Sequence, residues 1–155
     1  PKKIKEFDVK NKYACFMQKN LHQKINLLNL TVKNWAGTKI CQKKYLRSPQ
    51  WLRDIKTKKQ PFWKFYRPSQ PQIIFKGGWH FNDLKKANDL SKKIKSGAHQ
   101  EENLEEFTNI EKIKERMKQN KDLLGRDYRY EIIELNKDYP EYILNNKEKF
   151  KEWIL

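Results

Sequence analysis

The run Ile73-Ile74-Phe75-Lys76-Gly77-Gly78-Trp79-His80-Phe81 is the stretch that decides how this chain is interpreted. Its apolar start predicts a short buried strand, and the two glycines after it allow a backbone to approach a ligand closely or to take a positive φ. His80 can then act as an acid, a base or a metal ligand near neutral pH. A structural interpretation competes with this one: the glycines form a turn, the neighbouring aromatic side chains pack into a core, and His80 is merely hydrogen-bonded.

Length and composition predict one folded domain over residues 1–155. A chain of 155 residues can bury a real core, and a second independent domain is not expected at this length. Hydrophobic residues make up 37% of the chain and aromatic residues 13%, including five tryptophans spread along it. This composition favours a folded protein over a disordered one.

The net charge of +16 is carried mainly by lysine. Nucleic-acid binding is the usual interpretation of such an excess, because clustered basic side chains neutralise phosphates. Only six of the 35 basic residues are arginine, however, although the guanidinium fork is preferred for bidentate phosphate or base recognition. The lysines therefore favour a solvated surface, and we predict no nucleic-acid partner.

Two isolated cysteines and the hydropathy pattern exclude several other classes. Cys15 and Cys41 have neither the spacing of a zinc site nor that of a disulfide framework. No run approaches the roughly 20 apolar residues of a membrane span, and the N-terminus has no signal-peptide hydrophobic region.

Periodicity and capping residues predict a mixed sequence of strands and helices. Strands are expected at 13–17, 25–32, 39–42, 73–75 and 130–135, with a polar break after the first at residues 19 and 20. Ser48 before Pro49 predicts the start of a short helix. A longer helix is expected over 83–96, capped by Asn82 or Asp83 and closed by Gly97, and a capping box predicts another from Thr108. A last helical segment follows residue 140, and prolines make 57–72 a loop.

Several motifs, taken in order, resemble glycosyltransferase family 17, the family of β-1,4-mannosyl-glycoprotein 4-β-N-acetylglucosaminyltransferase. They are the segment 13–28, Trp35-Ala36-Gly37-Thr38, Ser48-Pro49-Gln50-Trp51-Leu52-Arg53, Gly77-Gly78-Trp79-His80-Phe81 and Lys93-Ile94-Lys95-Ser96-Gly97-Ala98-His99-Gln100-Glu101. The most specific element is Gly-Trp-His-Phe followed by a helix and then Ala-His-x-Glu. The resemblance covers nearly the whole chain.

The resemblance implies an α/β fold that is the C-terminal portion of a GT-A-like nucleotide-sugar transferase, with a mixed sheet and flanking helices. It further implies transfer of a sugar, N-acetylglucosamine in this family, from a UDP-GlcNAc-like donor to a glycan acceptor. The configuration of the anomeric carbon is inverted in this transfer. The family's acidic metal-binding motif lies upstream of a segment like the one at Pro1. We therefore expect a divalent metal, Mn²⁺ or Mg²⁺, in the intact enzyme. We expect the isolated chain to have no transferase activity. If the protein comes from a bacterium or a virus, we expect it in the cytoplasm.

The same resemblance implies roles for basic residues. His80 and His99 are candidates to complete the metal sphere or to hydrogen-bond the diphosphate, with His80 assigned as catalytic and His99 as the metal ligand. A surface histidine at a helix end is the alternative for His99. Arg53 and Arg67 are candidates to bind the donor's diphosphate.

Further roles involve the acceptor and the sugar ring. Glu101 is a candidate base for the acceptor hydroxyl, or else one more exposed glutamate. Gly77, Gly78 and Trp79 are expected to line a cleft, with Trp79 rather than Trp35 stacking on the sugar. The family continues this motif with Ser-Tyr where this chain has Asn82-Asp83, and we interpret Asp83 as a helix cap rather than a base.

Two other functions remain open at this point. One is a basic nucleic-acid-binding module, which would need clustered lysines and displayed aromatic side chains. The other is a non-catalytic carbohydrate-binding domain. If the chain is a part of a larger transferase domain, we expect edge strands with exposed apolar side chains near 13–17 and 73–75.

Overall fold

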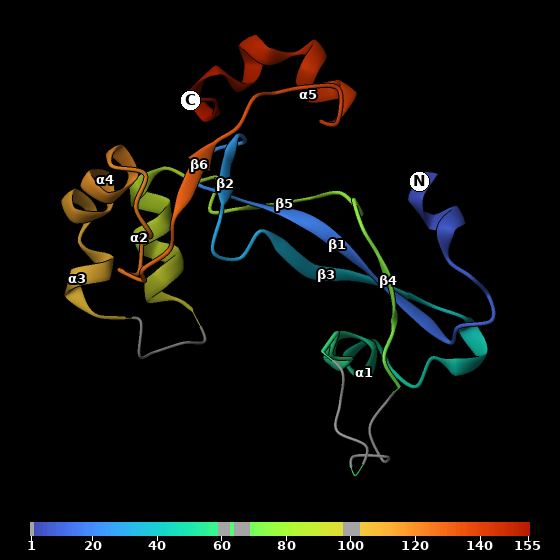
Figure 1. The fold of residues 1–155 in the computed structure, drawn as a ribbon. Helices are drawn as coiled ribbons and strands as arrows, with labels where there is room; N and C mark the ends of the chain where they lie inside the picture. The colour runs from blue at the N-terminus through green and yellow to red at the C-terminus, as the bar shows by residue number, and fades with distance from the viewer. Residues whose placement is uncertain (1, 59–62, 64–68, 98–102) are drawn as a thin grey trace. The chain divides into compact units, whose positions relative to one another are not determined.

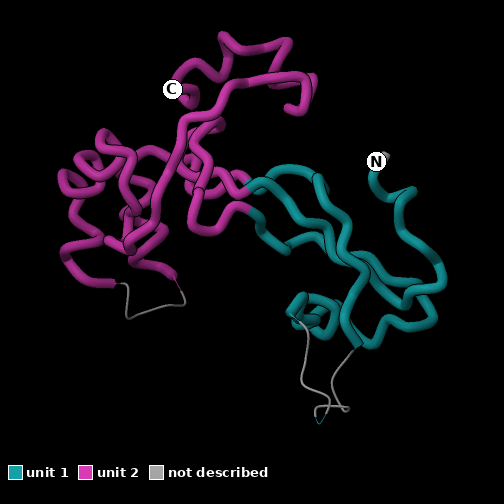
Figure 2. Tube along the Cα trace, viewed as in Figure 1, with its two compact units in different colours: residues 1–19, 34–80 teal, residues 20–33, 81–155 magenta. Residues whose placement is uncertain are grey.

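The computed structural model describes residues 2–58, 63, 69–97 and 103–155. The chain forms two compact units, coloured separately in Figure 2. Unit 1 comprises residues 1–19 and 34–80, and unit 2 comprises residues 20–33 and 81–155.

The fold is mixed α/β, as the sequence predicted, and its strands form a six-stranded sheet (Figure 1). The strands are β1 (Tyr13–His22), β2 (Leu27–Asn29), β3 (Asn34–Cys41), β4 (Gln72–Ile74), β5 (Trp79–Asn82) and β6 (Tyr130–Ile132). β1 pairs antiparallel with β2 and β3 and parallel with β4, and it also pairs with β5. β2 pairs antiparallel with β6.

In unit 1, the first half of β1 is an interior strand. Ala14 faces Ile40 of β3 on one side and Gln72 of β4 on the other, and Ala14, Phe16 and Ile74 form a buried cluster. The expectation that 13–17 forms an exposed edge is therefore wrong, because neighbours cover this segment on both sides. At 73–75 the result is mixed, since Ile74 is buried whereas Phe75 is 64% exposed.

The predicted short helix of unit 1 is confirmed as α1 (Pro49–Asp54). The Ser48 hydroxyl accepts a hydrogen bond from the Trp51 backbone N–H at 3.0 Å, and Pro49 occupies the first turn. The Trp51 ring meets Tyr13 edge-on at 5.8 Å, which packs α1 against the sheet. Two short 3-10 helices, Lys2–Glu6 and Lys43–Tyr45, complete the unit's helical elements among the described residues.

In unit 2, the end of β1 forms a hairpin with β2 in which Leu21 faces Leu28. The predicted polar break at residues 19 and 20 is wrong, because β1 continues through both to His22. Asn20 is tolerated in the strand because its side chain donates to the Val32 carbonyl and its backbone N–H to the Lys33 carbonyl, each at 3.0 Å.

The helical elements of unit 2 are α2 (Ala87–Lys95), α3 (Glu105–Thr108), α4 (Ile110–Lys118), α5 (Glu141–Asn145) and the 3-10 helix Lys147–Trp153. A second core, made by α2, α4 and the segment after α4, comprises Ala87, Leu90, Ile113 and Leu123. No helix in the described part of the chain has the length and apolar character needed to cross a membrane.

The helix starts of unit 2 differ in detail from the prediction. α2 begins at Ala87 after Lys86, so neither Asn82 nor Asp83 caps it. Asn82 ends β5, and Asp83 takes a positive φ of 57° in the turn that follows. α4 is capped by Asn109. Its side-chain oxygen accepts hydrogen bonds from the backbone N–H groups of Glu111 at 3.0 Å and Lys112 at 3.2 Å.

Candidate functional site

The two glycines of the Gly-Gly-Trp-His segment join two strands rather than a strand and a helix. Gly77 donates its N–H to the Met17 carbonyl at 2.8 Å, and the Gly78 carbonyl accepts from the Lys19 N–H at 2.9 Å. Both partners lie on β1, so the chain stays bound to this strand as it passes from β4 to β5. Between the predicted strand at 73–75 and the predicted helix over 83–96, the chain therefore forms a glycine link and a second strand, β5 (Trp79–Asn82).

Steric contacts explain why glycine occupies both positions. A Cβ atom on Gly77 would lie 2.5 Å from Cβ and 3.0 Å from Cα of Phe16, a buried residue of β1. Gly78 has a φ of 128°, which side chains rarely adopt. Only a residue without a side chain lets this segment lie so close to β1.

The segment presents His80 to the motif Trp35-Ala36-Gly37-Thr38 on β3. The imidazole stacks on the Trp35 indole with ring centroids 3.7 Å apart and planes 15° from parallel. A Cβ atom on Gly37 would lie 1.4 Å from the Trp35 ring, so the indole occupies the space that glycine leaves open. The structure thus brings together two motifs that the sequence analysis treated separately.

Polar side chains adjoin this stacked pair in unit 1. The Gln18 amide donates to the Thr38 hydroxyl at 3.0 Å, and it lies 3.5 Å from the Cβ position of Gly78. Trp35 is 41% exposed and His80 is half-buried, so a ligand can reach the pair from solvent. We call Trp35, His80, Gln18 and Thr38 the aromatic site.

Stacking fixes the plane of the imidazole without using its nitrogens. The N–H groups and lone pairs of histidine lie in the ring plane, whereas the contact with Trp35 uses the ring face. The contact with Trp35 therefore sets the orientation of the imidazole ring through its face.

Other predicted residues of unit 1 lie elsewhere. Trp79 precedes His80 in β5, and successive strand residues point to opposite faces, so the two side chains do not share one face. The structure pairs His80 with Trp35, not with Trp79. Arg53 is exposed in the last turn of α1, and its carbonyl accepts from the Lys39 ammonium.

Three predicted residues, Arg67, His99 and Glu101, lie outside the described residues. The roles predicted for these three residues therefore stay predictions. Within the described ranges, no three His, Cys, Asp or Glu side chains gather in a way that could hold a metal ion.

Unit 2 contains a pocket of about 370 Å³ beside the end of β5. Its charged lining comes from the turn after β5, from α2 and from the segment after α4, and its apolar lining from α2 and the same segment. The lining includes Asp83, Leu90, Lys93, Ile94, Leu123 and Arg126. Asp83 and Lys93 form an ion pair in which the Asp83 side chain is only 15% exposed.

A buried carboxylate holds Arg126 at this pocket. Asp122 accepts from Arg126 Nε at 2.9 Å and Nη2 at 2.8 Å, and its side chain is 2% exposed. Further bonds come from the backbone N–H groups of Leu124 and Arg126 at 3.0 and 3.2 Å and from the Tyr130 hydroxyl at 3.0 Å. This bidentate geometry fixes the plane of the guanidinium.

The pKa values of this network follow from burial and charge. Burial by itself would raise the pKa of Asp122, but the hydrogen bonds and charge of Arg126 outweigh it and leave the pKa below its usual value. Burial and the negative charge of Asp122 raise the pKa of Tyr130 well above its usual value. Asp122 is therefore ionised and Tyr130 remains a hydrogen-bond donor over the physiological range.

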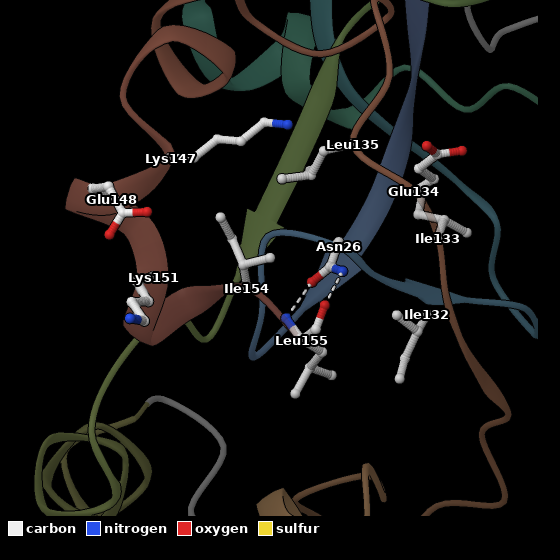
Figure 3. A pocket seen from close by; sticks show the side chains of 10 residues that line it. All are labelled: Asn26, Ile132, Ile133, Glu134, Leu135, Lys147, Glu148, Lys151, Ile154 and Leu155. Carbon is white, nitrogen blue, oxygen red and sulfur yellow. Dashed lines mark hydrogen bonds between the residues drawn. The ribbon is translucent and has the colours of Figure 1, made fainter.

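A second hollow of unit 2, of about 460 Å³, lies between the end of β6 and the 3-10 helix Lys147–Trp153 (Figure 3). Asn26 makes two hydrogen bonds there to the backbone of Leu155, at 2.9 and 3.0 Å. Lys147 and Lys151 line it but are exposed, which makes this hollow a solvated surface.

Lys93, Asp122 and Arg126 are not among the site residues predicted from the sequence. The spacing of Asp122 and Arg126 is that of an i, i+4 ion pair, and this spacing could have indicated their contact from the sequence. Spacing alone did not show that the carboxylate is buried, because this depends on Tyr130 and on β6.

No protein-family model, no curated protein and no solved structure matches this chain. The motifs that resemble glycosyltransferase family 17, and the arrangement of their side chains, are therefore the basis for a functional proposal.

Proposed function

We propose that this chain is part of a glycosyltransferase with a GT-A-like fold, which transfers N-acetylglucosamine from a nucleotide-sugar donor to a glycan acceptor. The stacking of His80 on Trp35 is the observation that carries the proposal. Two motifs of the family 17 resemblance meet in this stack: Gly37 leaves room for the Trp35 ring, and Gly77 lets the segment before His80 lie close to β1. A core-packing role alone would not require an accessible indole and imidazole.

His80 is the general base of the proposed reaction. The acceptor hydroxyl oxygen forms a bond to the anomeric carbon, and its proton passes to an imidazole nitrogen of His80. The bond between the anomeric carbon and the phosphate oxygen breaks, and its electron pair leaves with the nucleoside diphosphate. A positioned base of this kind contributes roughly 10²- to 10⁴-fold to the rate.

Trp35 acts as the positioning residue for that base. Its ring holds the imidazole plane, and its exposed area offers an apolar surface to the C–H face of a sugar. This assignment replaces Trp79 by Trp35 as the aromatic residue nearest the chemistry. Trp79 and Arg53 remain candidates for donor binding.

The experiment measures sugar transfer by the gene product that contains this chain. Labelled UDP-GlcNAc is incubated with a glycan acceptor mixture, and the release of UDP and the labelled product are followed. His80→Ala should lower kcat by roughly 10²-fold or more. Phe75→Ala, an exposed change in the same segment, is the matched control and should leave kcat within about twofold.

Failure would take a defined form. A folded gene product that releases no nucleotide from UDP-GlcNAc or from other nucleotide sugars would overturn the proposal. Glycan binding without turnover would identify a non-catalytic carbohydrate-binding domain instead.

A further inference from the structure

The pocket beside the end of β5 combines opposite charges with an apolar floor. Asp83 and Lys93 face it as an ion pair, and Arg126 is held there by Asp122. Its volume of about 370 Å³ lies at the small end of the range for small-molecule sites. Every residue of this lining belongs to unit 2.

The formal charges of this pocket cancel. Asp83 offsets Lys93, and Asp122 offsets Arg126. A phosphate or carboxylate ligand would find no net positive charge here, whereas hydroxyl groups would find both kinds of partner. The carboxylate accepts hydrogen bonds, and the ammonium and the guanidinium donate them.

Geometry leaves donors and acceptors for a ligand. The two bonds from the Arg126 side chain to Asp122 use Nε and Nη2, and Nη1 takes no part in them. The Lys93 ammonium has three donors, one of which contacts Asp83. The aliphatic side chains of Leu90 and Ile94 on α2 line the same pocket, and they suit the apolar C–H face of a sugar ring.

The backbone of Asp83 adds a second indication. A φ of 57° is uncommon for a residue other than glycine, and such strained conformations cluster at binding and catalytic sites. Lys85 donates its N–H to the Asp83 carbonyl at 2.8 Å, which fixes this turn directly after β5. The turn thereby places a carboxylate at the pocket directly after the last residue of β5.

We propose that this pocket binds one neutral sugar ring, with Asp83 accepting from its hydroxyl groups and Lys93 and Arg126 donating to them. The inference rests on the proposed function, because a glycan acceptor supplies the class of ligand. It adds a saccharide-binding position in unit 2, distinct in its residues from the aromatic site of unit 1.

The test is a titration of the ¹⁵N-labelled chain followed by amide and side-chain NMR signals. The probes are the methyl glycosides of mannose, galactose and N-acetylglucosamine, with inorganic pyrophosphate as the anionic probe. We expect at least one glycoside to shift the signals of Asp83, Lys93 and Arg126, and pyrophosphate to leave them in place. Asp83→Asn should weaken glycoside binding about tenfold, as expected for the loss of a charged hydrogen-bond acceptor.

Asp89→Asn is the matched control, because Asp89 is an exposed carboxylate on α2 outside the pocket lining. It should leave binding unchanged, and the spectrum of each variant reports whether it folds. The inference is overturned if no glycoside shifts these signals, if pyrophosphate shifts them and the glycosides do not, or if the two variants bind equally. His80→Ala should leave glycoside binding at this pocket unchanged. The transferase proposal fails separately if sugar transfer does not depend on His80.

Discussion

The aromatic site of unit 1 and the charged pocket of unit 2 are built in opposite ways. In unit 1, glycines remove side chains so that a strand, an indole and an imidazole can approach one another. In unit 2, a buried carboxylate collects hydrogen bonds and orients a guanidinium. The first arrangement depends on empty space and the second on paired charge, so different substitutions should break them.

The largest expected effect is on the buried carboxylate. Asp122→Asn removes the charge that holds Arg126 and should lower the free energy of unfolding by about 2–3 kcal/mol, since hydrogen bonds to charged groups are worth about 1.5–3 kcal/mol. Asp127→Asn makes the same change at an exposed position of the neighbouring segment and should cost less than about 0.5 kcal/mol. Urea denaturation measures both, and equal costs would show that the Asp122 network does not stabilise unit 2.

A slightly smaller loss is expected where unit 1 depends on empty space. Gly77→Ala would place a Cβ atom 2.5 Å from the buried Phe16 Cβ, so β1 or the glycine segment must move. Overpacking of this kind costs about 1–3 kcal/mol. A shift in the urea midpoint measures it, and an unchanged midpoint would mean that the close approach of the glycine segment to β1 does not exist in solution.

Gly37→Ala should disrupt the stacking of His80 on Trp35 while lowering the free energy of unfolding only slightly. Its Cβ would collide with the Trp35 ring, which is partly exposed and can swing towards solvent. The expected cost is about 0.5–1.5 kcal/mol, that of losing one aromatic pair. The ring-current shift of the His80 proton signals should disappear in this variant, and a retained shift would contradict the stacked arrangement.

The smallest expected effect is a change in the acid limb of the stability curve. The pKa of Asp122 is lower in the folded chain than its unfolded value of about 3.9, so its ionised form stabilises the fold above that pH. This contribution is lost as the pH falls through the folded pKa. The stability of Asp122→Asn should therefore fall less steeply than that of the wild type below about pH 4, and parallel curves in urea titrations at several pH values would refute the assignment.

The two regions also differ in how far the sequence predicts them. Ser48-Pro49 predicted α1 because a cap acts locally, and the apolar run at 13–17 predicted the start of β1. The continuation of β1 past its polar residues was missed, because Asn20 is satisfied by the chain at 32–33, which periodicity does not reveal.

The candidate sites are likewise predicted where the signal is local and missed where it depends on contacts distant in the sequence. His80 and the glycines before it stand out in sequence because unusual residues lie next to one another. The partnership of His80 with Trp35 does not, since it requires β1, β3 and β5 to be aligned. The Asp83 carboxylate was interpreted as a helix cap, but α2 begins at Ala87 and the turn before it takes a positive φ.

The central claim is that His80 exchanges a proton while Trp35 holds its ring. The most direct test is kcat for sugar transfer by the His80→Phe variant of the gene product that contains this chain, because phenylalanine keeps a flat aromatic ring for the indole and has no ring nitrogen. We predict that kcat falls by roughly 10²-fold or more while the fold and the stacking on Trp35 persist. A His80→Phe enzyme that transfers sugar at a rate within about twofold of the wild type would contradict this account.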